Sequence, residues 1–118
     1  CEWQAAAFGM LGLEIAASVA QDVLIDSGAS NWQRLAEVLS HNPARIGSLD
    51  EQGQAIAAGS IANITLIDPS VKREISTSHS KSSNNPYRGL TLPGAVVHTI
   101  YRGYPTLANG VLAEAGRN

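Results

Sequence analysis

Apolar residues recur at helical spacing in the first quarter of the chain. Between Gly12 and about Ile25, one series has the three- and four-residue steps of an amphipathic helix: Leu13, Ala16, Ala17, Ala20 and Leu24. A second apolar series lies on the opposite side of the same helix: Ile15, Val19 and Val23. The helix should end at Asp26-Ser27-Gly28, where Gly28 can take a left-handed conformation. We therefore expect this helix to need partners on two sides.

Two further helices are predicted before residue 48. The second should open at Ser30, whose hydroxyl can accept from the backbone of Gln33 while the Gln33 side chain reaches back, in a capping box. Its apolar stripe is narrower: Trp32, Leu35, Ala36 and Leu39. A short third helix should begin at Asn42-Pro43, with Asn42 as its cap, and close at Gly47.

After Leu49 the apolar period changes to that of strands. Residues 62–67 alternate between the two faces of a strand, and Asp68-Pro69 should stop that strand as a turn. Residues 71–75 predict a second short strand. The Ser- and Asn-rich loop 76–85 follows, and we expect it to be mobile unless another surface orders it.

The longest strand is predicted at residues 96–100, followed by a hairpin turn at Arg102-Gly103-Tyr104. The return strand, residues 105–107, begins with Pro105. Because proline has no N–H to donate, this strand should lie at the edge of its sheet. The overall class is α/β, with helices before Ser48 and a small sheet after it.

The helical part is too apolar to stand alone. Leaving an apolar side chain unburied forfeits roughly 1.5–3 kcal/mol, and the first helix carries six large ones: Leu13, Ile15, Val19, Val23, Leu24 and Ile25. Their sum is comparable with the whole net stability of a domain, about 5–15 kcal/mol. The helix therefore needs an apolar surface that the rest of the chain does not obviously supply.

Composition and charge exclude several classes of function. The chain has 118 residues, of which 44% are apolar and 15% charged, with a net charge of −2, as in a globular domain. Its eight Lys and Arg residues are scattered, which argues against a nucleic-acid partner. The nearly uncharged stretch 8–19 is too short and too polar to cross a bilayer. The first residue is not Met, and we expect a fragment or a processed product.

Cys1, the single cysteine, permits no internal disulfide and fits a cytoplasmic location. It is a poor nucleophile because no basic neighbour lowers its pKa. His41, His79 and His98 lie dozens of residues apart, without the close spacing of a zinc site. We assign them to hydrogen bonding at a helix junction, to a solvated loop and to a strand face, respectively.

Other candidate chemistry is equally weak. No nucleophile elbow or phosphate-binding glycine motif is present. Asp50-Glu51 and Asp68 are best explained as solvated turn residues. Trp3 and Trp32 stand at helix-like positions and are expected in the core rather than on a ligand platform. We therefore predict no catalytic residue and no metal ligand in this chain.

Five stretches, taken in order, resemble the C-terminal portion of the bacterial dihydroorotases in the amidohydrolase superfamily: Ala7–Glu14, Ser40–Gly47, Ala62–Pro69, Asn85–Gly89 and Thr99–Gly103. Single pieces also occur in other cyclic amidohydrolases, but their collinear order covers nearly the whole chain. The resemblance implies the end of a (β/α)8 metal-dependent hydrolase barrel, residues 1–47. It also implies the C-terminal part of a small composite β-sandwich, residues 48–118.

The same resemblance implies a function for the parent enzyme. Dihydroorotases cyclise N-carbamoyl-L-aspartate reversibly to dihydroorotate in de novo pyrimidine synthesis, with zinc as cofactor. Their metal ligands lie in barrel segments that would precede Cys1, so the chain alone should be inactive. Its expected partners are the remainder of the barrel, the substrate and, in a homo-oligomer, further copies of the enzyme.

One functional element is implied within the chain. In these enzymes the loop after the last barrel strand presents backbone groups to the substrate, and Phe8-Gly9 match it. A glycine allows such close approach of the backbone to a planar ring. Many relatives have Pro where Phe8 stands and Thr where Ile15 stands. Asn63 replaces an Asp usual in its strand, a change expected to affect folding and not catalysis.

Three other functions remain open. The chain could belong to a non-catalytic, dihydroorotase-like scaffolding subunit, because its motifs encode packing rather than metal binding. It could also come from a dihydropyrimidinase- or allantoinase-type cyclic amidohydrolase. A third possibility is that residues 48–118 form a free-standing binding module.

Overall fold

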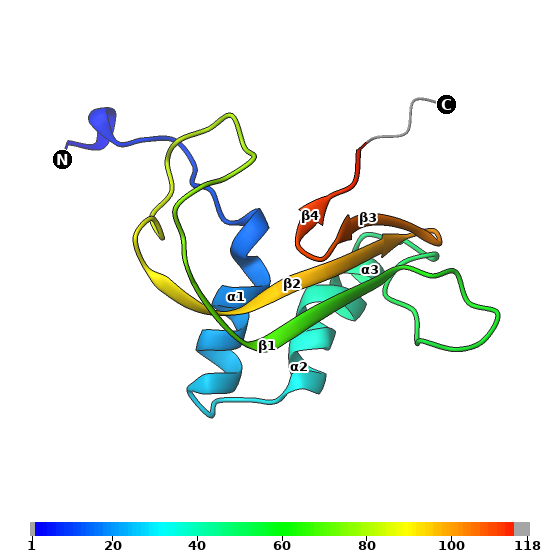
Figure 1. Ribbon diagram of the computed structural model, residues 1–118. Helices are drawn as coiled ribbons and strands as arrows, with labels where there is room; N and C mark the ends of the chain where they lie inside the picture. The colour runs from blue at the N-terminus through cyan, green and yellow to red at the C-terminus, as the bar shows by residue number, and fades with distance from the viewer. Residues whose placement is uncertain (1, 115–118) are drawn as a thin grey trace.

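A run of helices lies against one antiparallel sheet (Figure 1). The computed structural model describes residues 2–114, and Cys1 lies outside them. A 3-10 turn, η1 (Trp3–Ala5), stands apart from the rest near the N-terminus. The first helical run begins as η2 (Leu13–Ile15), continues as α1 (Ala16–Ala20) and ends as the π-helical turn η3 (Gln21–Asp26).

This first run confirms the helix predicted over residues 12–25. Gly28 follows it with a φ of +75°, and its N–H donates to the carbonyl of Ile25 at 2.9 Å. A left-handed glycine therefore ends the helix, as its position predicted. The side of the helix that carries Ile15 and Ser18 packs against the sheet, whereas Leu13 and Val23 remain exposed.

The second helical run is longer than predicted. It comprises α2 (Trp32–Ala36), the π-helical turn η4 (Glu37–His41) and α3 (Asn42–Ile46). The predicted cap at Ser30 is wrong by one residue, since the Oδ1 atom of Asn31 accepts from the N–H of Arg34 at 3.0 Å. The short third helix is confirmed as α3, which begins at Asn42 and is closed by Gly47, but its predicted cap is wrong, because Asn42 is already helical and follows directly on η4. Pro43 has no N–H to donate within the helix. The wider π-helical turn η4 just before it accommodates this missing hydrogen bond.

The sheet has four strands in the order β1-β2-β3-β4, and all neighbours are antiparallel. The bounds are β1 (Ile64–Glu74), β2 (Thr91–Tyr101), β3 (Tyr104–Ala108) and β4 (Val111–Leu112). The predicted hairpin turn is confirmed: Tyr101 pairs with Tyr104, and Arg102 and Gly103 have φ of 51° and 85°. Two positive φ values in a two-residue loop match the twist of the strands.

Two predictions about the strands are wrong. Asp68-Pro69 does not end the first strand but forms an irregularity inside β1, where residues 69–71 lie opposite Gly94 alone. The Asp68 carboxylate accepts from the N–H and the hydroxyl of Ser70, so the local turn is accommodated within one strand. The return strand β3 is not an edge, because β4 pairs with its last two residues.

The core of the described residues is small. Ile15, Ile75 and Leu92 form one buried cluster, against which Val19 and Tyr87 pack. The prediction that both tryptophans lie in the core is wrong, since Trp3 is 92% and Trp32 is 41% exposed. Trp3 belongs to η1, which projects from the body, and Trp32 opens a helix whose buried residue is Leu35. A large share of the apolar surface is therefore uncovered.

Two buried polar side chains fasten the first helical run to the irregular part of β1 and β2. The Ser18 hydroxyl donates to the carbonyl of Gly94 at 2.9 Å, and the Nε2 atom of Gln21 donates to the carbonyl of Pro69 at 3.0 Å. Both side chains are at most 3% exposed. Hydrogen bonds buried in this way fix the register of the helix on the sheet.

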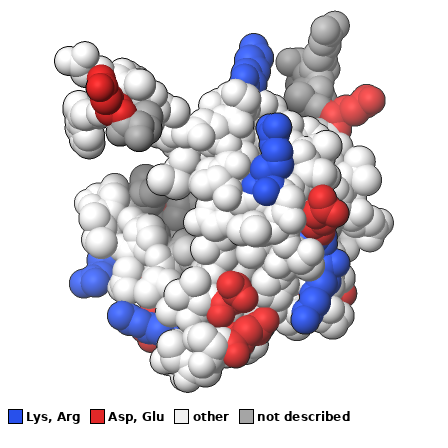
Figure 2. All heavy atoms as spheres, turned by 90° about the vertical axis from the view of Figure 1, so that its left-hand side faces the viewer, with Lys and Arg blue, Asp and Glu red and all other residues white. Residues whose placement is uncertain are grey.

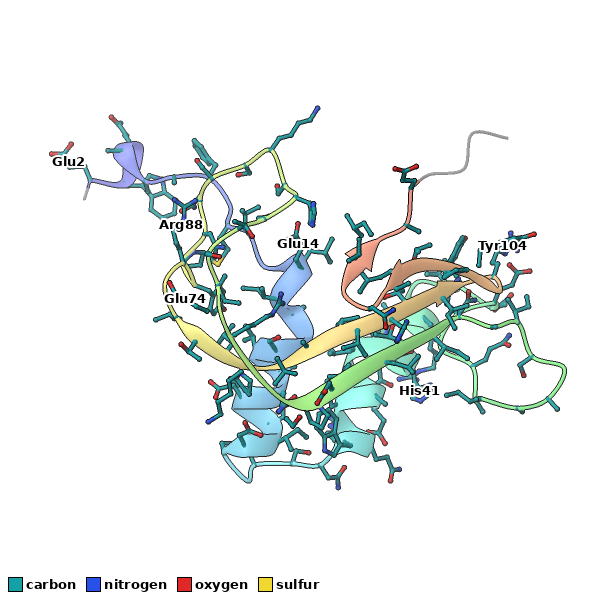
Figure 3. The ribbon with its side chains drawn as sticks, in the orientation of Figure 1. Glu2, Glu14, His41, Glu74, Arg88 and Tyr104 are labelled. Carbon is teal, nitrogen blue, oxygen red and sulfur yellow. The ribbon has the colours of Figure 1, made fainter. Side chains whose placement is uncertain are left out.

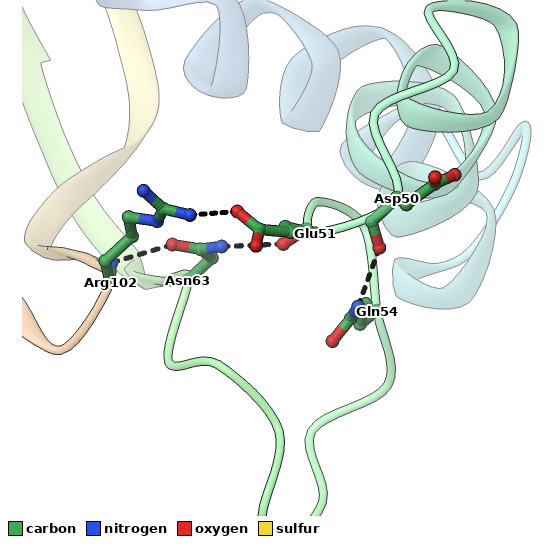
Figure 4. A network of polar contacts seen from close by, with 5 residues as sticks. All are labelled: Asp50, Glu51, Gln54, Asn63 and Arg102. Carbon is green, nitrogen blue, oxygen red and sulfur yellow. Dashed lines mark hydrogen bonds and ion pairs between the residues drawn. The ribbon is translucent and has the colours of Figure 1, made fainter.

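The connection between helices and sheet is held by a polar network (Figure 4). Asn63 donates from Nδ2 to the carbonyl of Glu51 at 2.8 Å and accepts at Oδ1 from the N–H of Arg102 at 2.8 Å. The Arg102 guanidinium forms an ion pair with the Glu51 carboxylate. Within the same loop Gln54 donates to the carbonyl of Asp50 at 2.7 Å. Asp50-Glu51 is exposed, as a solvated turn should be.

Candidate functional site

A pocket of about 370 Å³ lies where residues 10–15 pass beneath the loop 76–85. Figures 1 and 3 show the two segments side by side, with Glu14 at the start of the helical run next to this loop. The lining residues come from both segments: Met10, Leu11, Gly12, Leu13, Glu14, Ile15, Thr77, Ser78, His79, Ser80 and Asn85. The pocket adjoins Phe8-Gly9, the predicted substrate-binding pair.

Phe8-Gly9 are fully open to approach. The Phe8 side chain is 102% exposed, and Gly9 has a φ of +69° with nothing within 4 Å of where a Cβ would stand. Within residues 2–114 neither the Phe8 carbonyl nor the Gly9 N–H has a hydrogen-bond partner. This peptide group can therefore bind a ligand through its backbone, while its role toward a substrate stays a prediction.

Asn84 holds the neighbouring backbone groups. Its Nδ2 donates to the Gly9 carbonyl, and its own carbonyl accepts from the N–H of Leu11 at 2.8 Å. One residue of the loop thus hydrogen-bonds the backbone at residues 9 and 11, once through its side chain and once through its own backbone. Both partners are backbone groups, so these hydrogen bonds do not depend on the side chains at positions 9 and 11.

Glu14 forms a second attachment between the same two segments. Its Oε1 atom accepts from the Ser78 hydroxyl at 3.0 Å and from the N–H of His79 at 2.9 Å. The loop was expected to be mobile unless another surface ordered it, and residues 9–14 supply that surface. The chain therefore ties the polar loop to the segment that precedes its first helix.

Charges near the pocket are few. On the face that Figure 2 shows, acidic and basic side chains of the described residues are interspersed. Among residues 2–114 one carboxyl group has a clearly shifted pKa: the side-chain and backbone hydrogen bonds from Ser70 lower the pKa of Asp68. Because Asp68 lies in the irregular part of β1, this shift belongs to the fold and not to the pocket.

The described residues do not fit a metal ion. No three His, Cys, Asp or Glu side chains between residues 2 and 114 gather closely enough to hold one. The Nδ1 atom of His41 is hydrogen-bonded to the carbonyl of Gly53 at 2.6 Å, which confirms its predicted role. His79 is exposed in its loop, and His98 lies on β2, as predicted.

Sequence reasoning missed Glu14 and Asn84. Glu14 stands in an otherwise apolar helical series, and Asn84 is one of several polar residues in a loop of low complexity. Their partners lie 64 to 75 positions away along the chain. The only available signal was the excess of Ser and Asn in the loop, which indicates polar contacts without naming them.

Comparison with known proteins places these features in a family context. The chain is 48% identical to a dihydroorotase of Leifsonia xyli over 98% of its length, and 44% identical to one of Streptomyces coelicolor over 95%. In both cases it spans 27% of the relative's own length. No protein-family model matches the chain.

The fold has counterparts among solved structures. A D-hydantoinase (dihydropyrimidinase) from Thermus sp. matches with a TM-score of 0.83, over 96% of this chain and 25% of that chain, at 22% identity. Among residues 2–114 no helix is long and apolar enough to cross a membrane. The chain has the fold of about a quarter of a hydantoinase. Along nearly its whole length it is homologous to about a quarter of a bacterial dihydroorotase, which confirms its resemblance to these enzymes.

Proposed function

We propose that this chain is the C-terminal part of a dihydroorotase, which interconverts N-carbamoyl-L-aspartate and dihydroorotate in de novo pyrimidine synthesis. The observation that carries the proposal is the match to dihydroorotases along nearly the whole chain. In this proposal residues 1–47 are the last loop and helices of a (β/α)8 barrel. Residues 48–118 are the C-terminal share of a β-sandwich.

The uncovered apolar surface supports a larger enzyme. Leu13 is 93% and Val23 is 58% exposed. An apolar groove of about 420 Å³ runs along the first helical run, lined by Gly12, Ala16, Val19, Ala20, Val23, Leu24 and Tyr87. A contiguous apolar surface of this kind is typical of an interface. The remainder of the barrel would cover it.

The chemistry would depend on residues outside this chain. Dihydroorotases require zinc, and the described residues offer no ligand set for it. We therefore propose that the zinc ligands lie elsewhere in the parent enzyme and that this chain alone has no activity. The contribution of the chain itself would be the Phe8-Gly9 peptide group, whose free N–H and carbonyl can hydrogen-bond a substrate ring or its carboxylate.

A second candidate substrate class has its own support. The solved structures that match include hydantoinases and dihydropyrimidinases, which are named for other cyclic amides. Because the fold is shared, these substrates are the proper comparison in an assay. The higher identity to the dihydroorotases favours dihydroorotate.

The decisive experiment uses the full-length protein that contains this chain. It should be purified with zinc and offered dihydroorotate, N-carbamoyl-L-aspartate, hydantoin and dihydrouracil in parallel, with loss or gain of the ring followed by ultraviolet absorbance. Turnover of the first pair is expected, and the 118-residue chain alone should give none. Preference for hydantoin or dihydrouracil would overturn the substrate assignment.

Absence of any turnover by the full-length protein would favour the scaffolding alternative.

A cytoplasmic location and a homo-oligomeric state belong to the same proposal. Cell fractionation and light scattering of the full-length protein test these two points. A monomer or a membrane-bound protein would contradict them.

A further inference from the structure

We propose that Asn84 is a positioning residue for substrate binding, which sets the orientation of the Phe8-Gly9 peptide group by holding the backbone on its C-terminal side. This inference rests on the proposed function and deepens it. It assigns a role to a loop on the sheet side of the chain that neither the resemblance nor the sequence pattern connects with the substrate.

Some backbone groups of residues 8–11 are hydrogen-bonded and others are not. The Asn84 side chain donates to the Gly9 carbonyl, and the Asn84 backbone carbonyl accepts from the Leu11 N–H. The Phe8 carbonyl and the Gly9 N–H, one peptide unit earlier, have no partner among residues 2–114. The segment thus has two backbone groups hydrogen-bonded by the protein, while the Phe8-Gly9 peptide group is left available to a ligand.

The two peptide groups are joined through Gly9. The peptide group is planar and trans, so holding the Gly9 carbonyl fixes the plane that joins Gly9 to Met10. Gly9 has a φ of +69°, a conformation that few other residues adopt. Glycine is also the most freely rotating residue, and without an external hold this hinge would sample many orientations. Asn84 removes that freedom on one side of the hinge.

A second attachment prevents the loop from moving as a whole. Glu14 accepts from the Ser78 hydroxyl and the His79 N–H, and all three residues line the pocket. Residues 9–14 are therefore held at both ends by the same loop. Two attachments define the orientation of the segment, which a single flexible contact would not.

A preorganised backbone group binds its ligand at a lower entropic cost. Losing the Asn84 side chain should therefore weaken substrate binding more than it slows the chemistry. In kinetic terms KM rises while kcat is retained, the signature of lost uniform binding.

The test compares three variants of the full-length protein. In Asn84→Ala the side-chain donor is removed, and in Asn84→Asp the shape is kept but the donor is replaced by an acceptor. Ser83→Ala is the matched control, since the Ser83 side chain lies in the same loop and is exposed. We expect KM for dihydroorotate to rise roughly 3- to 10-fold in both Asn84 variants, the equivalent of one hydrogen bond. Both kcat and the Ser83→Ala enzyme should change less than about twofold.

Hydrogen exchange supplies a readout that does not depend on turnover. Peptides covering residues 8–12 should exchange faster in both Asn84 variants than in wild type or Ser83→Ala. Unchanged KM or unchanged exchange in an active enzyme would overturn the positioning role alone. A wild-type protein that neither converts nor binds dihydroorotate would overturn the proposed function, and this role with it.

Discussion

The side-chain oxygen of Gln21 lies directly against Gly94, so that a Cβ added at Gly94 would collide with it and would stand 3.1 Å from the Gln21 Cδ atom. Gln21 is 2% exposed, and its Oε1 has no hydrogen-bond partner among the described residues. Gly94 also has a φ of +72°. Two independent constraints therefore act at this position, one from the backbone and one from the helix packed on it.

Gly94→Ala should be more destabilising than a glycine substitution with backbone strain alone. Gly28 provides the matched control, because its φ is +75° and nothing lies within 4 Å of an added Cβ. Gly28→Ala should cost about 1–2 kcal/mol. Gly94→Ala should cost at least about 1 kcal/mol more, because it adds the collision with Gln21. Chemical denaturation measures both values.

A double-mutant cycle isolates the collision. In a Gln21→Ala background the extra cost of Gly94→Ala should largely disappear, leaving the backbone strain. An undiminished cost in that background would show that Gln21 is not the cause.

Ser18→Ala should lower the free energy of unfolding by about 1–3 kcal/mol. The substitution leaves the Gly94 carbonyl without its donor in a buried position. Ser60→Ala, at an exposed position in the loop before β1, should change stability by less than about 0.5 kcal/mol. Equal effects of the two substitutions in denaturant titrations would contradict the buried hydrogen bond.

Asp68 should titrate below its ordinary range, and Ser70 should be the reason. The hydroxyl and the N–H of Ser70 lower the pKa of Asp68, so its ionised form stabilises the fold. That stabilisation is present above the unfolded pKa of about 3.9 and is lost as the pH falls through the lower, folded pKa. In Ser70→Ala the pKa should move part of the way back up, since the backbone donor remains. Carboxyl-carbon NMR shifts against pH measure it; an unmoved midpoint would contradict the assignment.

The Asn63 side chain should protect the backbone amide of Arg102 from hydrogen exchange. Asn63→Ala removes the acceptor, so the Arg102 N–H should lose protection from hydrogen exchange and stability should fall by roughly 1–2 kcal/mol. Asn63→Asp restores the residue usual in the family and keeps the acceptor, so the amide should stay protected. Gln54→Ala, which removes a contact within the loop, is the control and should leave Arg102 unaffected.

Local signals predicted much of the fold. The helical spacing over residues 12–25, Gly28 at the helix end and Arg102-Gly103 in the hairpin turn each act through neighbouring residues, and each was confirmed. The joining of two predicted strands into β1 was missed because Asp68-Pro69 has turn chemistry in either case. What decides between a strand end and an irregularity is pairing with β2, which is not encoded locally.

The candidate site divides in the same way. Phe8-Gly9 were predicted as substrate-binding through a resemblance carried by contiguous residues, and that role stays a prediction. Asn84 and Glu14 act across 75 and 64–65 positions, respectively, and no periodicity in a single sequence connects such residues. Trp3 was predicted in the core from its residue type and its helix-like position, yet the described residues provide no element to cover it.

The hydrogen bond between Ser18 and Gly94 also has a consequence in time, because its partners are 76 positions apart. Contacts of such high contact order form late, since the intervening chain must first be closed into a loop. At a synthesis rate of about 5–20 residues per second, Gly94 leaves the ribosome roughly 4–15 s after Ser18. Throughout that interval the first helix exists without the strand that accepts the Ser18 hydrogen bond, so its position on the sheet is fixed only after synthesis has passed Gly94.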